Sequence, residues 1–197
     1  MKKIFLLLML VPLMAIQPVF AADAKGVNLK PKTTKEWQTY LRYRRDQALE
    51  DLYKIKPEAK VVIGSAQGYA VFSNFGMKIG FIGGGNGRGV LHDNKTGKET
   101  FMRMAQAGVG FGLGVKDFRT IFVFDDRKVM ENFISSGWSF GSQADAAAKA
   151  EKDGAATNGA IAIAPGVRVY QLTENGLSIE IMVSGTKYWV DAAVNEK

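Results

Sequence analysis

The pattern of apolar and polar positions predicts a helical first part and a strand-rich remainder. Between residues 34 and 55, apolar residues recur at the spacing that keeps them on one face of a helix. These residues are Trp37, Leu41, Ala48, Leu52 and Ile55. Thr33 or Thr34 is suited to cap this helix, and Glu36 falls in its first turn, where the helix dipole favours a carboxylate. A second, shorter helix is predicted between residues 57 and 68.

Beyond residue 68 the period changes to that of β-strands. The 39 residues from Gly76 to Gly114 hold 12 of the 22 glycines, which mostly alternate with apolar residues. Alternation with a period of two leaves one face of a strand almost without side chains and lets other backbone approach it. The polar run from Asp93 to Gly97 predicts a hairpin loop within this region.

The rest of the chain is predicted to be a series of strands interrupted by one short helix. Strands are expected at residues 69–75, 119–124, 138–151, 160–164, 167–172, 177–183 and 187–190, the short helix at 128–134 and a loop at 152–158. Asp125 or Asp126 is suited to cap the short helix. The predicted fold class is α+β, with N-terminal helices packed on a glycine-rich, mainly antiparallel β-sheet or sandwich, in a single domain from residue 34 to 197.

The N-terminus has the three-part pattern of a secretory signal. Lys2 and Lys3 precede a nearly unbroken apolar run from Ile4 to Ile16, and small residues end the segment at Ala21. The run is shorter than a membrane-spanning helix requires. We therefore expect residues 1–21 to be a cleaved signal, residues 22–33 to be a flexible lead-in, and the mature protein to be periplasmic.

Composition excludes most kinds of catalytic and metal site. There are no cysteines, and His92 is the only histidine, so disulfides, thiolate metal sites and paired histidine ligands are excluded. The run from Gly83 to Gly89 superficially resembles a phosphate-binding loop, but residues 90–92 continue as strand where such a loop needs a helix. We predict no catalytic residue, no metal site and no cofactor.

The charge of the chain favours an anionic partner. Loss of a signal that carries two lysines and no acid lowers the formal net charge from +7 to +5. A basic excess of this size suits lipid head groups, lipopolysaccharide or nucleic acid, and export argues against nucleic acid.

Several motifs, in order, resemble the SYLF domain. They lie at residues 66–74, 80–91, 106–114, 121–124 and 169–177, and include Gly87-Arg88-Gly89-Val90. The chain departs from the family at Ser73, where proline is frequent, and between residues 137 and 158. The resemblance implies binding of anionic phospholipid through an N-terminal amphipathic helix and nearby basic residues, without catalysis.

The first helix and the basic residues around it are therefore the candidate lipid-binding site. The candidates are Lys32, Lys35, Trp37, Arg42, Arg44, Arg45 and Arg88. We expect the helix arginines to be exposed and to meet phosphates, with Trp37 and Tyr40 at the head-group boundary. The apolar stripe of the helix either inserts into the membrane or packs on the sheet. Lys78 and Arg103, beside Arg88 on or near the glycine strands, are the next candidates.

Two other functions stay open at this point. One is a structural or interaction domain of the cell envelope that binds another protein and makes no direct contact with lipid. The other is a hydrolase, which we disfavour because no nucleophile and base occur in a recognisable arrangement.

The predicted signal is testable by N-terminal sequencing of the protein from a periplasmic fraction. We expect the mature chain to begin near Ala22, because the small residues at the end of the apolar run suit signal peptidase. A product that begins at Met1 and stays in the membrane pellet would contradict this expectation.

Overall fold

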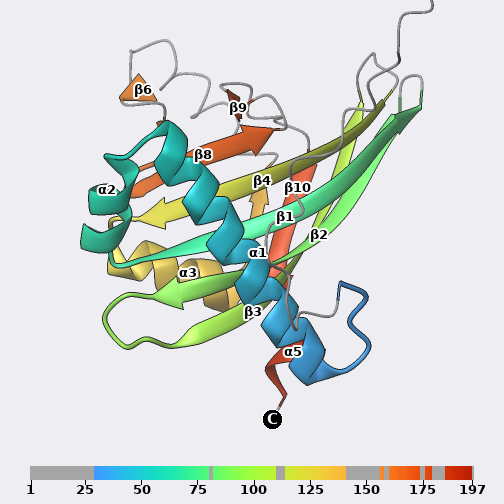
Figure 1. Ribbon diagram of the computed structural model, residues 1–197, viewed down its shortest axis with the longest axis horizontal. Coiled ribbons are helices and arrows are strands. Elements are labelled where there is room, and N and C mark those ends of the chain that lie inside the picture. Colours follow the sequence, from blue (N-terminus) through green and yellow to red (C-terminus); the bar gives the residue numbers. More distant parts are fainter. Residues whose placement is uncertain are drawn as a thin grey trace, which may run out of the picture.

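A curled antiparallel β-sheet forms the centre of the computed structural model, which describes residues 29–79, 82–109, 114–140, 156–157, 160–173, 176–178 and 185–196 (Figure 1). The helices are α1 (Thr34–Ile55), α2 (Ala59–Ser65), α3 (Arg127–Ser136) and α5 (Ala192–Asn195). The longer strands are β1 (Gly68–Ile79), β2 (Ile82–Asp93), β3 (Glu99–Val109), β4 (Gly114–Phe124), β8 (Val167–Thr173) and β10 (Gly185–Val190). The shorter strands are β5 (Trp138–Phe140), β6 (Ala156–Thr157), β7 (Ala160–Ala164) and β9 (Gly176–Ser178). The strand order is β5-β10-β3-β2-β1-β4-β8-β7-β6, with β9 paired to β8.

Helix α1 has the predicted bounds, and its cap explains where it begins. The Thr33 hydroxyl accepts a hydrogen bond from the Glu36 backbone N–H at 3.2 Å, and the Glu36 carboxylate accepts one from the Thr33 N–H at 3.2 Å. This reciprocal pair satisfies two N–H groups that the first turn leaves without partners. Helix α2 is shorter than predicted, because Pro57 and Glu58 form a turn that precedes it.

The sheet curls so strongly that its two halves meet. The ring of Tyr188 on β10 lies 4.7 Å from that of Phe72 on β1 and 5.1 Å from that of Phe122 on β4. Three strand spacings separate β10 from β1, which is about 14 Å in a flat sheet. The face that carries these rings is therefore the inside of the curl, where Met130 and Phe133 of α3 complete the core.

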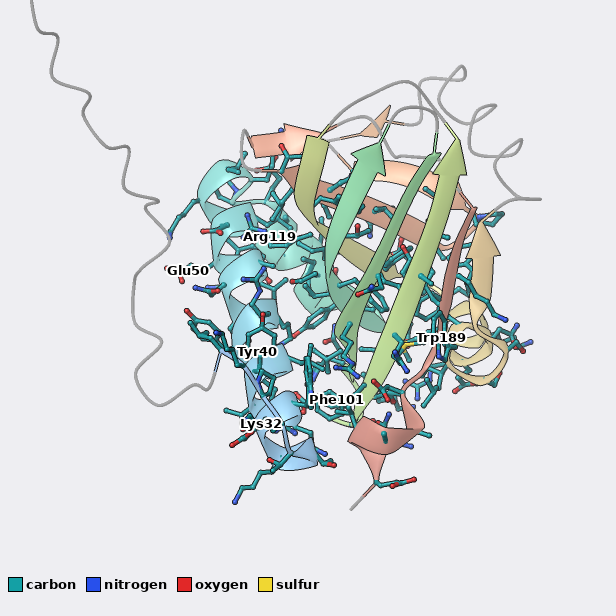
Figure 2. All side chains as sticks on the ribbon, turned by 90° about the vertical axis from the view of Figure 1, so that its right-hand side faces the viewer. Lys32, Tyr40, Glu50, Phe101, Arg119 and Trp189 are labelled. Carbon is teal, nitrogen blue, oxygen red and sulfur yellow. The ribbon has the colours of Figure 1, made fainter. Side chains whose placement is uncertain are left out.

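The opposite, outer face of the sheet is covered by α1 and α2 (Figure 2). Leu41, Ala48 and Leu52 are buried there, as the apolar stripe predicts. Ile55 is an error in that prediction, since its side chain is 46% exposed. Ala59 and Ile63 of α2 continue the core beyond Leu52, and Ile55 is not part of that cluster. Of the two roles considered for the stripe, this structure shows packing on the sheet.

The predicted α+β class and most of the later elements are confirmed. Asp126 caps α3 by accepting from the Val129 N–H at 3.1 Å, while Asp125 pairs with Arg168. Sequence analysis missed α5 and the short strand β6, which lies in a segment predicted to be a loop. The signal segment 1–21, most of the lead-in, and parts of the predicted strands 138–151 and 177–183 lie outside the described residues.

No helix within the described ranges has both the length and the apolarity to cross a bilayer.

The glycine-rich segment is a strand, as predicted, and at Gly89 the absence of a side chain is required. β2 pairs with β1 and β3 throughout residues 83–89. A Cβ atom at Gly89 would lie 2.3 Å from the Val71 carbonyl oxygen and 2.6 Å from the Phe72 ring. The glycine thus lets the Phe72 ring lie against the backbone of β2, inside the curl.

Replacing Gly89 with alanine is expected to lower the free energy of unfolding by about 1–3 kcal/mol, because the new methyl group overpacks the core. Gly64 of α2 is the matched control, since a Cβ there has nothing within 4 Å. Gly64→Ala should raise stability by about 0.5–1 kcal/mol through helix propensity. Urea unfolding measures both changes, and a Gly89→Ala variant as stable as the wild type would refute the packing argument.

Candidate functional site

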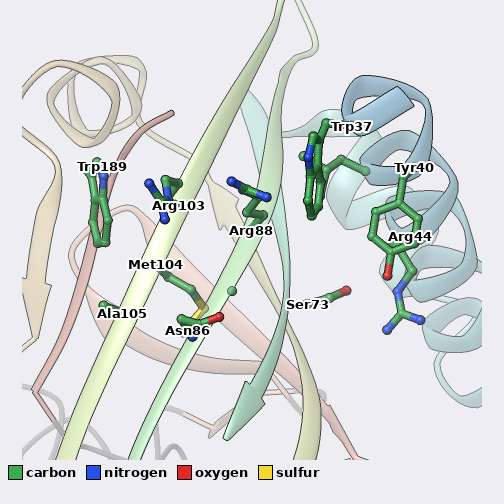
Figure 3. Close-up of a pocket in the computed structure, with 12 residues that line it drawn as sticks. Trp37, Tyr40, Arg44, Ser73, Asn86, Arg88, Arg103, Met104, Ala105 and Trp189 are labelled. Carbon is green, nitrogen blue, oxygen red and sulfur yellow. The ribbon is translucent and has the colours of Figure 1, made fainter. Parts of the chain in front are cut away.

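A pocket of about 590 Å³ opens on the outer face of the sheet, between α1 and β10 (Figure 3). Its walls are arginines, aromatic rings and small polar groups. They are Trp37, Tyr40, Leu41 and Arg44 of α1, Ser73 of β1, Asn86, Gly87 and Arg88 of β2, Arg103, Met104 and Ala105 of β3, and Trp189 of β10. The size is within the range of ordinary small-molecule sites.

Strand register places the polar side chains of the pocket in one row. Ser73 is opposite Arg88, Arg88 is opposite Arg103, and Arg103 is opposite Trp189. The Arg88 guanidinium lies 3.8 Å from the centre of the Trp37 ring, and that of Arg103 lies 5.9 Å from the Trp189 ring. Figure 3 shows the two arginines side by side between the two indoles. We call Trp37, Arg88, Arg103 and Trp189 the Trp–Arg row.

One buried carboxylate serves both arginines of the row. Asp191 follows β10, its side chain is 4% exposed, and its Oδ2 accepts a hydrogen bond from Arg88 Nε at 3.0 Å. Arg103 Nε lies 3.9 Å from the same oxygen. Because one carboxylate faces two guanidinium groups, one positive charge stays uncompensated within this trio.

The hydroxyl of Ser73 is the second unusual group of the pocket. Its oxygen is buried and has no hydrogen-bond partner among the described residues. Buried polar atoms of native proteins are nearly always hydrogen-bonded to protein or to ordered water, so this hydroxyl can bond to a water or to a bound molecule.

The structure separates Arg42 and Arg45 from this pocket, and it corrects the expectation of exposure for Arg45, while the Arg42 side chain is 42% exposed. Arg42 Nε donates to Glu99 at 2.6 Å, and Arg45 Nη1 donates to the other oxygen of Glu99 at 2.5 Å. The Arg45 side chain is only 14% exposed and also pairs with Asp46. These arginines attach α1 to β3, because the helix turns them toward the sheet. The sequence does not show that a carboxylate lies opposite them.

The remaining predicted residues fall into two groups. Trp37, Arg44 and Arg88 meet in the pocket, where Trp37 also packs beside the core cluster around Leu41. Lys32 and Lys35 are exposed at the start of α1 and are not among the lining residues.

Sequence reasoning named Arg103 only as a secondary candidate and missed Ser73, Trp189 and Asp191. The period-two alternation places Ser73 on the face opposite to Phe72, and Trp189 on the face opposite to Tyr188. That alternation was readable in the sequence. The register that brings these residues into one row was not.

The sequence of this chain was compared with those of known proteins. The chain is similar to Beta cell expansion factor A of Aeromonas veronii. The two are 35% identical over 180 residues, which cover 89% of this chain and 66% of the relative, so the chain spans just under two thirds of the relative's length. The relative's name describes an effect on beta cells and names no ligand. No family model matches the chain, and the SYLF resemblance rests on the motifs alone.

The chemistry of the pocket suits binding of an anion. Its charged side chains are all guanidinium groups, which hold phosphate or carboxylate oxygens by paired N–H donors. His92 is not part of the lining, and its ring lies against Tyr69 at 5.4 Å. Within the described ranges, no three histidine, aspartate or glutamate side chains are grouped closely enough to hold a metal ion.

Glu99 is expected to contribute to stability in a pH-dependent way. Burial of Glu99 opposes its ionisation, but the hydrogen bonds and charges of Arg42 and Arg45 outweigh burial and lower the pKa of its carboxyl below 4.5. A lowered folded-state pKa gives stability that is present above the unfolded-state pKa and is lost as the pH falls through the folded-state value.

Replacing Glu99 with glutamine should therefore cost about 1–3 kcal/mol at pH 7, and the difference from the wild type should shrink as the pH falls below the ordinary glutamate pKa of 4.5. Urea unfolding across pH measures the difference. Glu50→Gln is the control, because Glu50 and its partner Lys54 are 69% and 65% exposed, and such pairs contribute little. A loss that is the same at all pH values would contradict the ionic argument.

Proposed function

We propose that this protein is an exported, non-catalytic binder of anionic phospholipid that acts at a membrane surface in the periplasm. The observation that carries the proposal is the gathering of three arginines and three large aromatic side chains around one open pocket on the outer face. The arginine guanidinium is the side chain best matched to phosphate oxygens. Tryptophan and tyrosine are the residues that favour the head-group level of a membrane.

The exposed lysines at the start of α1 support the same proposal. Lys32 and Lys35 lie at the start of the helix that carries Trp37 and Tyr40 into the pocket wall. Basic residues near an anionic surface attract it over about a Debye length, which is roughly 8–10 Å at physiological salt. The resemblance to the SYLF domain implies the same class of ligand.

Binding in this proposal does not require α1 to leave the sheet. The apolar stripe of α1 is occupied by core contacts, so its insertion into a membrane would uncover the sheet residues packed beneath it, among them Val71, Ile121 and Val123. The folded protein instead presents the outer face, with the pocket and the basic start of α1, to the lipid.

A second candidate is an interaction domain of the cell envelope without direct lipid binding. It is favoured by two exposed apolar side chains, Ile55 at the end of α1 and Val61 of α2, which are 46% and 74% exposed. Burial of these exposed apolar side chains against another protein would remove them from water, which favours association.

Co-sedimentation of the mature protein with vesicles separates these two functions. We expect pelleting with vesicles of phosphatidylglycerol mixed into phosphatidylcholine, weaker pelleting as salt rises, and none with phosphatidylcholine alone. Absence of pelleting with either kind of vesicle would refute the lipid proposal and favour the protein partner, and equal pelleting with both would refute the preference for anionic lipid.

The contribution of the exposed lysines is measured in the same assay. Replacing Lys32 and Lys35 together by glutamine should weaken binding roughly ten- to thirtyfold at low salt, since each basic residue contributes about 1 kcal/mol. Replacing Lys95 and Lys98 by glutamine is the control, because these lysines are also exposed and lie in the hairpin turn between β2 and β3. Equal losses in both pairs would show that only net charge matters.

A further inference from the structure

We infer that the pocket on the outer face binds one phosphate group, held between Arg88 and Arg103 with the Ser73 hydroxyl beside them. The inference rests on the proposed function and deepens it. The proposed function needs only a general attraction between basic residues and an anionic surface, whereas this inference adds recognition of one phosphate group at a defined site.

Arg88 is held in position for such a role. Its Nε donates to Asp191 at 3.0 Å, and its flat face lies 3.8 Å from the centre of the Trp37 ring. Asp191 is itself fixed, because it is 3% exposed and its backbone N–H donates to the Phe101 carbonyl at 3.0 Å. Among the described residues, neither Nη atom of Arg88 has an acceptor, and both stay available to a ligand.

Arg103 supplies a second set of donors next to the first. Within the described part of the chain its guanidinium makes only the 3.9 Å approach to Asp191 and the 5.9 Å contact with Trp189, and its side chain is 50% exposed. Two like charges directly opposite each other on neighbouring strands destabilise a sheet. Asp191 offsets only one of them, so an anion between the two arginines would relieve the remaining repulsion.

The buried Ser73 hydroxyl points independently to a ligand. Ser73 is opposite Arg88 in the β1–β2 register, lines the same pocket, and lacks a partner among the described residues. A phosphate oxygen held by Arg88 would supply the acceptor that this hydroxyl lacks.

The pocket is larger than a phosphate ion and leaves room for the group attached to it. Its volume of about 590 Å³ extends past the arginines to the rings of Tyr40, Trp37 and Trp189. Three neighbouring strands, β1, β2 and β3, each place a donor at this pocket, and a phosphate has three or four oxygens to accept from them where a carboxylate has two. The ligand class is therefore a phosphate ester, either a phospholipid head group or a small soluble phosphate.

Titration with soluble phosphates tests the inference without a membrane. The probes are inorganic phosphate, glycerol 3-phosphate, and dihexanoyl phosphatidic acid below its micelle concentration, followed by calorimetry on the mature protein. We expect saturable binding with one site per chain. Binding of the lipid probe alone identifies a head-group site, and equal binding of glycerol 3-phosphate identifies a soluble ligand.

Two variants assign the binding to the pocket. Arg103→Gln should weaken it on the order of ten- to a hundredfold, through loss of a charged hydrogen-bond donor. Ser73→Ala should weaken it roughly two- to tenfold. Removing an unsatisfied buried hydroxyl should leave the Tm equal or higher, which a merely structural serine would not do. Lys128→Gln of α3 makes the same charge change away from the pocket and should bind as the wild type does.

The outcomes for the pocket and for the proposed function are distinct. If anionic vesicles bind Arg103→Gln and Ser73→Ala as tightly as wild type and no soluble probe binds, the pocket inference is overturned and lipid binding stands. If the soluble probes bind and depend on both residues while vesicles do not bind, the pocket stands and the membrane proposal fails.

Discussion

The curl of the sheet is the constraint on which the rest of the structure depends. It is set inside by the rings of Phe72, Phe122 and Tyr188, which meet across strands that a flat sheet would hold far apart. Gly89 makes this possible, because any side chain there would occupy the place of the Phe72 ring. On the outside, a straight helix can contact only part of a convex surface. Helix α1 therefore lies over β1, β2, β4 and the start of β3. It leaves the region toward β10 open, and the pocket is that open region.

The arginines of the outer face have two different roles, which depend on the carboxylates that lie opposite them. Glu99 receives both Arg42 and Arg45, and Asp51 of α1 receives Arg119 of β4, so these pairs attach the helix to the sheet. Asp191 faces Arg88 and Arg103 with a single carboxylate, and only Arg88 donates a hydrogen bond to it. In this second arrangement, N–H donors of Arg88 and Arg103 have no acceptor among the described residues, and the two guanidinium groups face the open pocket. The capacity of a basic surface to bind an anion thus depends on how many of its cationic side chains already pair with a carboxylate, and not on the number of cations alone.

The C-terminal segment links the helix, the sheet and the pocket. Asn195 of α5 exchanges hydrogen bonds with both backbone groups of Phe101 on β3, at 3.0 and 2.7 Å. Gln38 and Thr34 of α1 donate to the carbonyls of Val194 and Ala193. These contacts fix Asp191, one residue before α5, at the base of the Trp–Arg row. The short helix thereby holds together two pocket walls that come from opposite ends of the chain.

The sequence by itself determined the local structure. The 3.6-residue stripe, with a threonine at position 33 or 34 to cap it, indicated the bounds of α1. The period of two indicated the strands, and the polar turn at Asp93 indicated the β2–β3 hairpin. Each of these signals depends on residues within a few positions of one another. Tertiary structure alone decided which cations form the site. Helical spacing places Arg42 and Arg45 on a common side of α1, but their partner Glu99 lies more than fifty residues away. The alignment of Ser73, Arg88, Arg103 and Trp189 across four strands likewise depends on strand register. Register is set by packing across the whole sheet, and no local pattern encodes it.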